Sequence, residues 1–581
     1  MATVGLPYFS LATTNPLIQS WFSDAMGGAT PYRLFAISNA GSLLGLFSYP
    51  LVVEPLLSLR HQVQIWSAAY LLFCLLWVPL IFLRITRLGG KKASFVIEVK
   101  GPLVARAIWV ALAACSSALL CAVTNHLTQD VAPIPMLCIV PLGVYLFSFI
   151  LCFRKQLQVS RRWLLELLIV ALVAMAYGLT SRFENESLSI LLPIYIIGLF
   201  ICCVFCHAEL ARRKPVPAQL TSFYLMIALG GLLGGVFVGV VAPLLFNSHL
   251  ELPITIGFVS VVGICALRDD AADVSHRARW RLRWVAITLL AIGFNVILIF
   301  IVWQNLSGAK VLARNFYGCL RVVDQRVRPS SDIGKRGNTA SYDATRKLQN
   351  GSIDHGIQFL SSELRRVPTS YYGVNSGIGV ALRSLGRHGS LRVGVVGLGA
   401  GTLAAYGRPG DFYRFYEINP LVANLAKSEF TFLSDSEAKV EIVLGDARLV
   451  LEKQAPQAFD LLAIDAFSGD AIPLHLLTRE AFSLYRSHLK SRGILAVHIS
   501  NIYLDLQSVV FGTTDSMDLR SVLIHDKDDP QNHIYASDWI LITDNQDSFD
   551  DPAIQKAVAQ KLNPKRLVWT DDFSNLLRVL N

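Results

Sequence analysis

A glycine-rich turn lies in the second half of the chain, where residues 393–406 read VGVVGLGAGTLAAY. The turn consists of Gly397-x-Gly399-x-Gly401 between a strand-like apolar run and a helix-like continuation. Glycines at such a junction let the backbone approach a ligand closely. A dinucleotide, a phosphate and an adenosylmethionine-type nucleoside are the three ligands to be distinguished.

The spacing of this turn argues against two of those ligands. A phosphate-binding Walker loop ends in Gly-Lys followed by Ser or Thr, and the turn lacks that ending. A dinucleotide fingerprint has its third glycine three residues after the second, where this chain has Thr402. The acidic residues that follow the turn bear on the third ligand, an adenosyl nucleoside.

Two acidic residues follow the turn at the ends of predicted strands. Glu417 lies 20 residues after Gly397, where a carboxylate suits the hydroxyl groups of a ribose. Asp446, followed by Ala447, could accept a hydrogen bond from an adenine amino group. A glycine turn, a ribose acid and an adenine acid in this order resemble the adenosylmethionine-binding fold.

Asp465 ends the next predicted strand, in the segment AIDAFSGDAIP. A carboxylate beside the bound nucleoside could orient or deprotonate an attacking amine. The structural alternative is a helix N-cap or a turn carboxylate. We take Asp465 as the candidate general base.

The elements that must position these residues are alternating strands and helices. Apolar runs predict five strands, in the order LRVGVVG, FYRFYE, KVEIVL, AFDLLAI and GILAVHI. Polar residues at their carboxyl ends are typical of a doubly wound α/β sheet, which binds ligands at that edge. We expect a Rossmann-like, adenosylmethionine-binding α/β domain over residues 381–581, preceded by a small β-rich segment over 313–380.

The first half of the chain has the composition of a membrane domain. The 581 residues are 53% hydrophobic and only 16% charged, whereas soluble proteins are nearer one quarter charged. We expect a polytopic α-helical domain of about nine helices over residues 1–305, in contact with the lipid bilayer. The apolar windows lie near 33–57, 63–83, 103–123, 132–153, 163–181, 188–206, 220–246, 253–267 and 284–303.

Basic residues cluster in alternate loops of this domain. Arginines and lysines gather near 84–100, 154–162, 212–214 and 277–283, which predicts that these loops are cytoplasmic. If all nine segments cross the membrane fully, the C-terminal domain lies on the side of the membrane opposite the cytoplasm. A re-entrant eighth segment would place it in the cytoplasm, the side expected for adenosylmethionine chemistry, and we retain both alternatives. The expected location is a bacterial inner membrane.

Polar residues at the end of the sixth predicted span, His207 and Glu209 in CHAEL, are candidates for a functional role. Interfacial anchoring is the alternative. Cys202, Cys203 and Cys206 have a spacing seen in metal sites, but they lie in an apolar run and are expected to be buried thiols. We expect no metal, and without a basic stripe interleaved with aromatics we expect no nucleic-acid partner.

Several segments together resemble the spermidine synthase family, and most closely its membrane-fused group. They are ARNFYGCLRV (313–322), LQNGSIDHGIQF (348–359), the glycine turn, YEIN, GDAR and DAFSGD. The resemblance implies aminopropyl transfer from decarboxylated adenosylmethionine to a diamine, with release of methylthioadenosine. It assigns ribose binding to Glu417, adenine recognition to Asp446 and the general base to Asp465, with Tyr372 as the partner of that base.

Departures from the family pattern concern the half of the site that binds the acceptor. Soluble synthases have an aspartate where this chain has Ala400, and a Tyr-His-Glu stretch where it has Tyr372-Gly373-Val374. Their Asp-x-x-Asp loop becomes Asp465-x-x-Ser468, with Asp470 nearby. The residues that could rebuild an acceptor site are Asp354, His355, Asp470, His498, Asn501, Asp571 and Asp572.

We therefore predict a membrane-bound transferase that uses S-adenosylmethionine or its decarboxylated form and transfers or cyclises the three-carbon arm. The acceptor is expected to be a small-molecule amine or another small nucleophile. A transporter or sensor that binds an adenosyl nucleoside or polyamine without chemistry is one alternative, and a methyltransferase is another. For the oligomeric state, we retain both a monomer and a homo-oligomer as alternatives.

Overall fold

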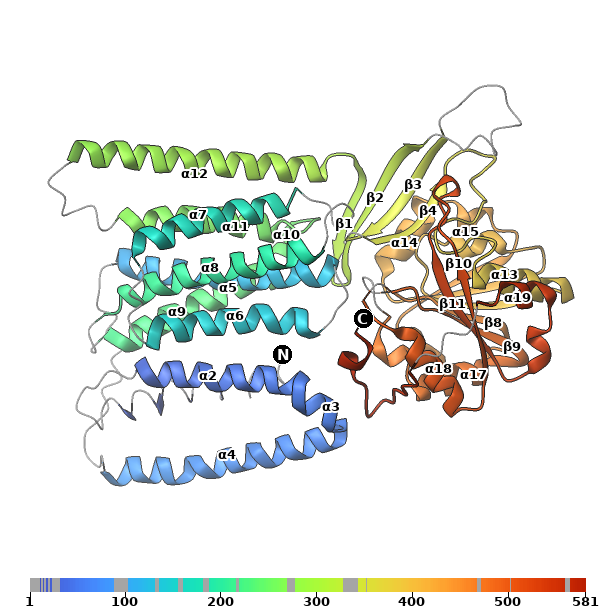
Figure 1. Ribbon diagram of the computed structural model, residues 1–581, viewed down its shortest axis with the longest axis horizontal. Coiled ribbons are helices and arrows are strands. Elements are labelled where there is room, and N and C mark those ends of the chain that lie inside the picture. Colours follow the sequence, from blue (N-terminus) through green and yellow to red (C-terminus); the bar gives the residue numbers. More distant parts are fainter. Residues whose placement is uncertain are drawn as a thin grey trace. The chain divides into compact units, whose positions relative to one another are not determined.

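Long apolar segments and shorter mixed segments fold into two separate units in the computed structural model (Figure 1). One unit is formed mainly by residues up to Ser307 and the other mainly by Gly308–Asn581, and each is considered by itself. The structure describes residues 11, 14, 17–18, 21–22, 32–87, 103–130, 135–154, 160–180, 188–215, 219–268, 277–327, 343–351, 353–467, 472–501, 503–559 and 565–580.

Over its described residues, the regular secondary structure of the N-terminal unit is helical (Figure 1). The described part of each of the nine predicted windows falls mainly on helix, and a short π-helical turn interrupts the first and the seventh. The helices are α2 (Tyr32–Ser48), α3 (Glu54–Leu56), α4 (Leu59–Arg87), α5 (Leu103–Asp130), α6 (Pro135–Arg154), α7 (Arg161–Gly178), α8 (Leu188–Arg212), α9 (Leu220–Val236), α10 (Ala242–Leu245), α11 (Glu251–Arg268) and α12 (Arg277–Leu306).

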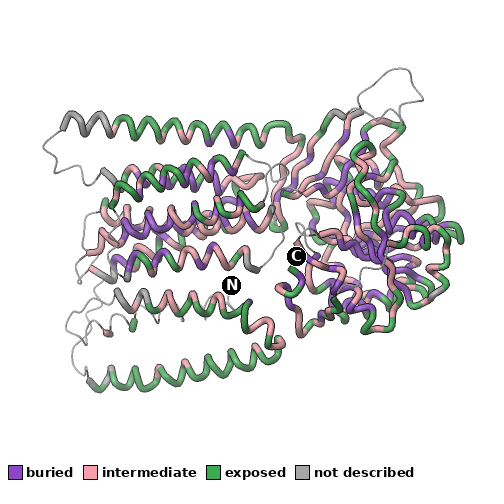
Figure 2. The backbone as a smooth tube through the Cα atoms, viewed as in Figure 1, coloured by how far each residue is buried: buried purple, intermediate pink, exposed green. Residues whose placement is uncertain are grey.

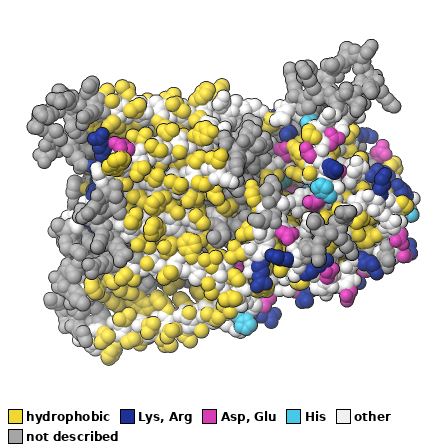
Figure 3. Space-filling model, viewed as in Figure 1, with side chains coloured by type: hydrophobic (Ala, Val, Ile, Leu, Met, Phe, Trp, Pro, Cys, Tyr) yellow, Lys and Arg dark blue, Asp and Glu magenta, His cyan; other side chains and the backbone are white. Residues whose placement is uncertain are grey.

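Five helical stretches among the described residues are long and apolar enough to cross a membrane. They are Leu59–Leu83, Leu103–Gln129, Ser189–Arg212, Ser222–Leu245 and Trp284–Leu306. Hydrophobic side chains cover the visible face of this unit (Figure 3), and α4 is exposed along most of its length (Figure 2). An apolar exterior on helices is the pattern expected of a surface that contacts lipid.

The C-terminal unit begins with a four-stranded antiparallel sheet, which corresponds to the predicted β-rich segment. Its strands are paired in chain order, β1 (Ala309–Asn315), β2 (Gly318–Val327), β3 (Asp343–Asn350) and β4 (Ile353–Phe359). The first strand begins four residues before the predicted start at 313. Only Ser307 and Gly308 separate the end of α12 from β1.

A seven-stranded mixed sheet forms the core of this unit, in the order β10-β11-β9-β8-β5-β6-β7. The five predicted strands are its parallel part, and β11 runs antiparallel to both β9 and β10. They are β5 (Arg392–Val396), β6 (Phe412–Glu417), β7 (Lys439–Leu444), β8 (Phe459–Ile464) and β9 (Leu489–His498), followed by β10 (Arg520–Asp526) and β11 (Ser537–Thr543). This is a Rossmann-like fold with a mixed sheet.

The helix α13 (Gly377–Leu385) precedes β5, and helices follow most of the strands, since parallel neighbours need crossover connections. The later helices are α14 (Pro420–Ser428), α15 (Phe432–Asp435), α16 (Ala447–Lys453), α17 (Arg479–His488), α18 (Leu506–Ser516) and α19 (Pro552–Ala557). Buried apolar side chains of β5 and β6, such as Val393, Val395, Tyr413 and Phe415, pack in one cluster with those of α13. This core holds the strand ends in place.

Candidate active site

A cavity of about 370 Å³ lies at the carboxyl edge of the parallel strands. Its walls include residues at or just after the ends of β5, β6, β7, β8 and β9. The strand order reverses at β5, which has β8 on one side and β6 on the other. Doubly wound sheets bind ligands at such a switch point, so the cavity lies where the fold favours a ligand.

The glycine turn forms one wall of the cavity through Gly397 and Gly399. Both have positive φ, +102° and +54°, which side chains other than glycine rarely adopt. A Cβ at Gly399 would also lie 2.5 Å from the carbonyl oxygen of His355. Gly401, with φ +85°, packs against Leu433 and is not part of the cavity wall. The third glycine thus shapes the turn, and the first two face the ligand space.

Glu417 ends β6 and is 7% exposed. Its carboxylate accepts hydrogen bonds from the backbone N–H of Leu398, at 3.0 Å, and of Asn419, at 2.8 Å. Burial raises the pKa of Glu417, and the backbone amides of Asn419, Leu398 and Ile418 oppose that rise. Each carboxylate oxygen has a second lone pair, so Glu417 can still accept from ribose hydroxyls.

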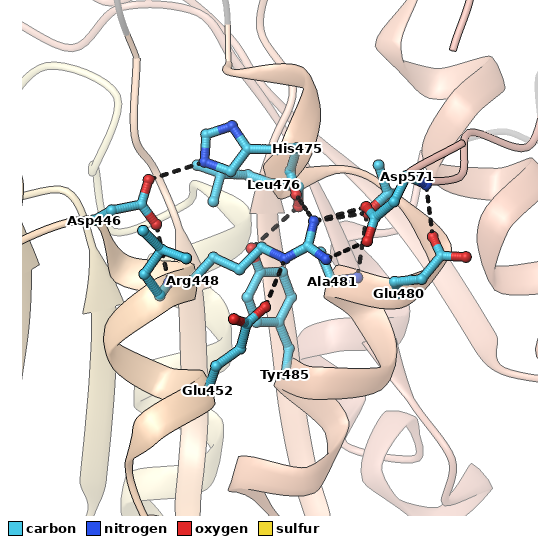
Figure 4. A network of polar contacts seen from close by, with 11 residues as sticks. Asp446, Arg448, Glu452, His475, Leu476, Glu480, Ala481, Tyr485 and Asp571 are labelled. Atoms are coloured by element: carbon cyan, nitrogen blue, oxygen red, sulfur yellow. Dashed lines mark hydrogen bonds and ion pairs between the residues drawn. The ribbon is translucent and has the colours of Figure 1, made fainter. Parts of the chain in front are cut away.

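Asp446 begins α16 and borders the same cavity together with Ala447. One carboxylate oxygen of Asp446 accepts from the backbone N–H of Leu449, and the other lies 3.1 Å from Nε2 of His475 (Figure 4). The carboxylate therefore caps the helix as well as facing the cavity, so the capping and binding roles are compatible. His475, a wall residue from the loop after β8, was not predicted.

Asp571 was predicted in the acceptor site, but the structure places it in an ion pair outside the cavity wall. Arg448 contacts its two carboxylate oxygens at 2.8 and 2.5 Å and also donates to the carbonyl oxygen of His475 (Figure 4). Thr478 adds a hydrogen bond of 2.8 Å to Asp571. Through Arg448, Asp571 supports the loop that carries His475. The neighbouring Asp572 is likewise absent from the cavity wall.

Asp465 follows β8 at the centre of the cavity and receives two side-chain contacts. Tyr372 donates its phenolic O–H to Oδ2 at 2.6 Å, and Nδ1 of His498 lies 2.7 Å from Oδ1. Burial raises the pKa of Tyr372 well above its ordinary value, and the charge of Asp465 raises it further. Tyr372 is therefore a neutral hydrogen-bond donor at physiological pH.

His498 ends β9 and continues the polar chain beyond Asp465. Its Nε2 lies 2.9 Å from Oγ of Ser500, which in turn accepts from the backbone N–H of Asp538 at 2.8 Å. The imidazole stacks on the Trp539 indole with ring centroids 4.5 Å apart and planes 5° from parallel. Stacking and hydrogen bonds on both ring nitrogens hold His498 in one orientation.

Asp354 lies in β4 and is 9% exposed. Nζ of Lys347 is 3.0 Å from its Oδ2, Nε2 of Gln349 donates to Oδ1 at 2.9 Å, and the hydroxyl of Tyr535 donates to Oδ2 at 2.5 Å. Lys347 neutralises the charge that Asp354 would otherwise present to a cationic acceptor. Lys347 and Tyr535 were not predicted.

His355 and Asn501 both border the cavity, as the sequence predicted for acceptor residues. Burial lowers the pKa of His355, although Asp465 and Asp354 oppose the shift, so the ring is neutral at physiological pH. Its buried Nε2 has no hydrogen-bond partner among the described residues. The side-chain oxygen of Asn501 accepts from the backbone N–H of Tyr503 and Leu504, which orders the loop after β9. Asp470 lies outside the described residues.

Ala400, where the soluble synthases have an aspartate, is 1% exposed and belongs to an apolar cluster. Its neighbours there include Leu348, Phe430 and Phe432, and its backbone N–H donates to the carbonyl oxygen of His355 at 3.0 Å. Ala400 is not part of the cavity wall. The position therefore serves packing beneath the glycine turn.

Comparisons with known proteins cover part of the chain. No protein-family model matches the chain. A polyamine aminopropyltransferase of Vibrio vulnificus is 32% identical over 112 residues, which are 18% of this chain and 37% of that protein. The chain thus spans little more than one third of that relative's length. Over this part, it is similar to the polyamine aminopropyltransferases.

Solved structures that match part of the chain include two spermidine synthases. A probable spermidine synthase from Corynebacterium glutamicum has 17% identity and a TM-score of 0.31, covering 40% of this chain and 79% of that one. The spermidine synthase of Thermotoga maritima has 13% identity and a TM-score of 0.29, covering 47% and 84%. Human methyltransferase-like protein 13 in complex with SAH has 18% identity and a TM-score of 0.24, covering 33% and 93%.

Proposed function

We propose that the chain is a membrane-bound transferase of the spermidine synthase type, which moves or cyclises the three-carbon arm of S-adenosylmethionine or of its decarboxylated form. The observation that carries the proposal is the position of Asp465. Its carboxylate lies in the wall of the cavity shared with Gly397, Glu417 and Asp446, and is oriented by Tyr372 and His498.

The nucleoside part of the cavity fits an adenosyl group. Gly397 and Gly399 form the turn in the cavity wall, where a Cβ would collide with the backbone of Asp465 or His355. Glu417 retains lone pairs for ribose hydroxyls, and Asp446 presents a carboxylate for an adenine amino group. When bound, the sulfonium supplies a leaving group, since its carbon–sulfur bond breaks as the nucleophile bonds to that carbon and sulfur keeps the electron pair. Orientation of the two reactants could supply much of the acceleration.

Asp465 is the proposed acceptor of the proton that the attacking amine loses. Tyr372, held as a neutral phenol, and His498 keep the carboxylate in one orientation for that transfer. His355 is neutral and lies in the same wall, so it adds no positive charge against an ammonium group.

The acceptor part of the cavity differs from a polyamine groove. A linear polyamine needs several free carboxylates along its length, but Asp354 is paired with Lys347 and Asp571 with Arg448. We therefore propose a short amine, or the donor's own amino group in a cyclisation, as the nucleophile. Both need only one carboxylate at the reacting nitrogen, and Asp465 provides it.

The helical unit is proposed to cross the lipid bilayer with its basic loops on the cytoplasmic side. The five long apolar stretches and the apolar exterior support this arrangement. A multi-pass protein of a bacterial inner membrane is the setting that we propose. A reporter fused to the C-terminus that is active on only one side of the membrane tests where the C-terminal unit lies.

Product analysis of the purified full-length protein tests the reaction. We expect methylthioadenosine from adenosylmethionine or its decarboxylated form, in the presence or absence of short amines. Asp465→Asn should lower the rate about 10²- to 10⁴-fold, as expected for loss of a general base. Asp547→Asn, which changes a side chain 70% exposed, is the matched control.

Each remaining outcome contradicts the proposal and identifies an alternative. Adenosylhomocysteine as the product would indicate a methyltransferase. Binding of the nucleoside, or flux of a substrate across proteoliposomes, with no product from either donor would indicate a sensor or transporter.

A further inference from the structure

Aromatic side chains surround Asp465 in the wall of the cavity at the sheet edge. Tyr372 and His498 contact its carboxylate, and Tyr371 and Phe467 lie in the same wall. Tyr371 and Phe467 are both half-buried. The proposed reaction gives these last two rings no role, although they lie beside the proposed base.

The rings contact one another through the imidazole of His498. Tyr371 lies against it with ring centroids 5.2 Å apart, and Phe467 meets it edge to face at 4.8 Å. The same imidazole stacks on the indole of Trp539, which is completely buried and donates its Nε1–H to the carbonyl oxygen of Tyr371. Tyr371, Phe467 and His498 therefore form one aromatic wall, which the buried indole holds in place.

The carboxylates of the described cavity wall leave one for an acceptor. Glu417 and Asp446 face the nucleoside part, and Asp354 is paired with Lys347. Among the described wall residues, Asp465 is the carboxylate that remains for an ammonium group. A diamine would place its second ammonium group in the cavity without a free carboxylate there, which is costly.

The aromatic wall suits the carbon part of an amine better than a second charge. Aromatic rings pack edge to face or offset against a ligand ring, which adds to the free energy of burying apolar surface. Their faces also attract an ammonium group before it loses its proton. His355, in the same cavity wall, is neutral and adds no charge. This part of the cavity therefore fits one ammonium group next to an apolar ring.

We propose that the acceptor is an arylalkylamine, a primary amine with a single ammonium group and an aromatic substituent. The proposal rests on the transferase function proposed above and specifies its acceptor. The ammonium group pairs with Asp465, and the ring lies against Tyr371 and Phe467. Once Asp465 has taken one proton, the nitrogen bonds to the carbon of the three-carbon arm, and the carbon–sulfur bond breaks with its electron pair on sulfur.

Kinetics with two amines test this acceptor. The purified full-length protein is given phenylethylamine or diaminobutane with each donor, and methylthioadenosine is measured together with the alkylated amine. We expect kcat/KM for phenylethylamine to exceed that for diaminobutane at least about tenfold, because the diamine buries a second ammonium group without a partner. An equal or higher kcat/KM for diaminobutane overturns the proposal.

Phe467→Leu and Tyr371→Leu test the aromatic wall, since leucine keeps apolar bulk but has no ring. Each should lower kcat/KM for phenylethylamine roughly two- to tenfold, as for loss of an aromatic pair, and change that for diaminobutane less. Phe511→Leu is the matched control, because Phe511 is also half-buried but contacts Arg566 and is not part of the cavity wall. Test variants that lose no more than this control overturn the proposal.

Binding without turnover separates the acceptor from the reaction. Calorimetry measures the affinity of each amine for the protein. If no donor gives methylthioadenosine but phenylethylamine binds at least about tenfold more tightly than diaminobutane, the proposed reaction fails and the arylalkylamine site stands. If methylthioadenosine forms at the same rate with and without amines, the reaction stands and the arylalkylamine is overturned, because the donor's own amino group is then the nucleophile. Neither product nor preference overturns both.

Discussion

Tyr372 donates a hydrogen bond of 2.6 Å to Oδ2 of Asp465, although the two residues are 93 positions apart in the chain. The contact joins the segment before α13 to the end of β8. Burial and the charge of Asp465 raise the pKa of Tyr372, so the phenol stays protonated and can donate to the carboxylate. The other carboxylate oxygen meets His498, so Asp465 is restrained on both sides.

Tyr372→Phe tests whether this restraint assists catalysis. A hydrogen bond to a charged group contributes about 1.5–3 kcal/mol, so we expect kcat to fall roughly ten- to hundredfold. Steady-state kinetics measure the loss. Tyr413→Phe is the control, since Tyr413 is also buried in this unit but does not border the cavity. An unchanged kcat in Tyr372→Phe would assign the residue to packing alone.

His498 can be tested by separating its hydrogen bond from its stacking. His498→Phe keeps a ring to pack on Trp539 but loses the nitrogen that faces Asp465. His498→Asn loses the ring but can place a donor near the position of Nδ1. We expect His498→Asn to retain at least about tenfold more activity than His498→Phe. Equal activity of the two variants would show that the contact with Asp465 is dispensable.

Glu417 should make donor binding sensitive to pH. Burial raises its pKa, so the carboxylate that accepts from ribose becomes protonated at a higher pH than an ordinary glutamate does. We expect the donor's Kd to rise as pH falls from about 7 toward 5, as measured by calorimetry. The same raised pKa makes the folded state hold this proton more tightly than the unfolded chain. Glu417 therefore favours the folded state more at low pH and loses that contribution as pH rises through its folded pKa.

Glu417→Gln provides the control for that experiment. It should weaken binding at every pH and remove the pH dependence. It should also lower the free energy of unfolding by about 1–3 kcal/mol, because the side-chain NH₂ of the glutamine would then face the backbone N–H of Leu398 or Asn419. A pH dependence that persists in the variant would assign the titration to another group.

Asp571 should contribute to stability near neutral pH, and lose that contribution in acid, without a role in catalysis. The hydrogen bond from Arg448 lowers its pKa, although burial opposes the shift. A lowered pKa means that its contribution to stability is fully present above the unfolded value and is lost as pH falls through the folded one. The side chain is 45% exposed, so we expect Asp571→Asn to cost less than about 1 kcal/mol near neutral pH.

Thermal unfolding of Asp571→Asn over a pH series checks this expectation. The difference from the native protein should shrink toward acid pH. Glu452→Gln is the control, because Glu452 also pairs with Arg448 and is 46% exposed. A kcat loss comparable to that of Asp465→Asn would instead place Asp571 in the acceptor site.

The parallel half of the main sheet could be predicted because its strands are mostly apolar runs, and those of β5 and β8 are almost fully buried. Glu417, Asp446 and Asp465 follow directly, since the carboxyl ends of parallel strands meet at one edge. The five predicted strands end with β9 and do not include β10 and β11. β10 reads RSVLIHD, with exposed polar residues at both ends, which is typical of an edge strand and gives a weak apolar signal.

Residues outside that edge could not be predicted, because their partners depend on strand register and loop paths. Lys347 lies in DATRKLQN, which reads as a solvated strand, and only the pairing of β3 with β4 brings it to Asp354. In the sequence, Asp571 and Asp572 indicate a binding site because two acidic residues are adjacent. The path of the C-terminal segment instead brings Asp571 to Arg448, whose position on α16 gives no sequence signal for that pairing.

The contact between Gly356 and Ala400 limits how this site can change in evolution. A Cβ at Gly356 would lie 2.5 Å from the Cβ of Ala400, so the two positions share one small space. An aspartate at position 400 would push a carboxylate into the surrounding apolar cluster. A carboxylate at this position therefore needs more than one substitution, because the strand that carries Gly356 and the glycine turn would have to change together.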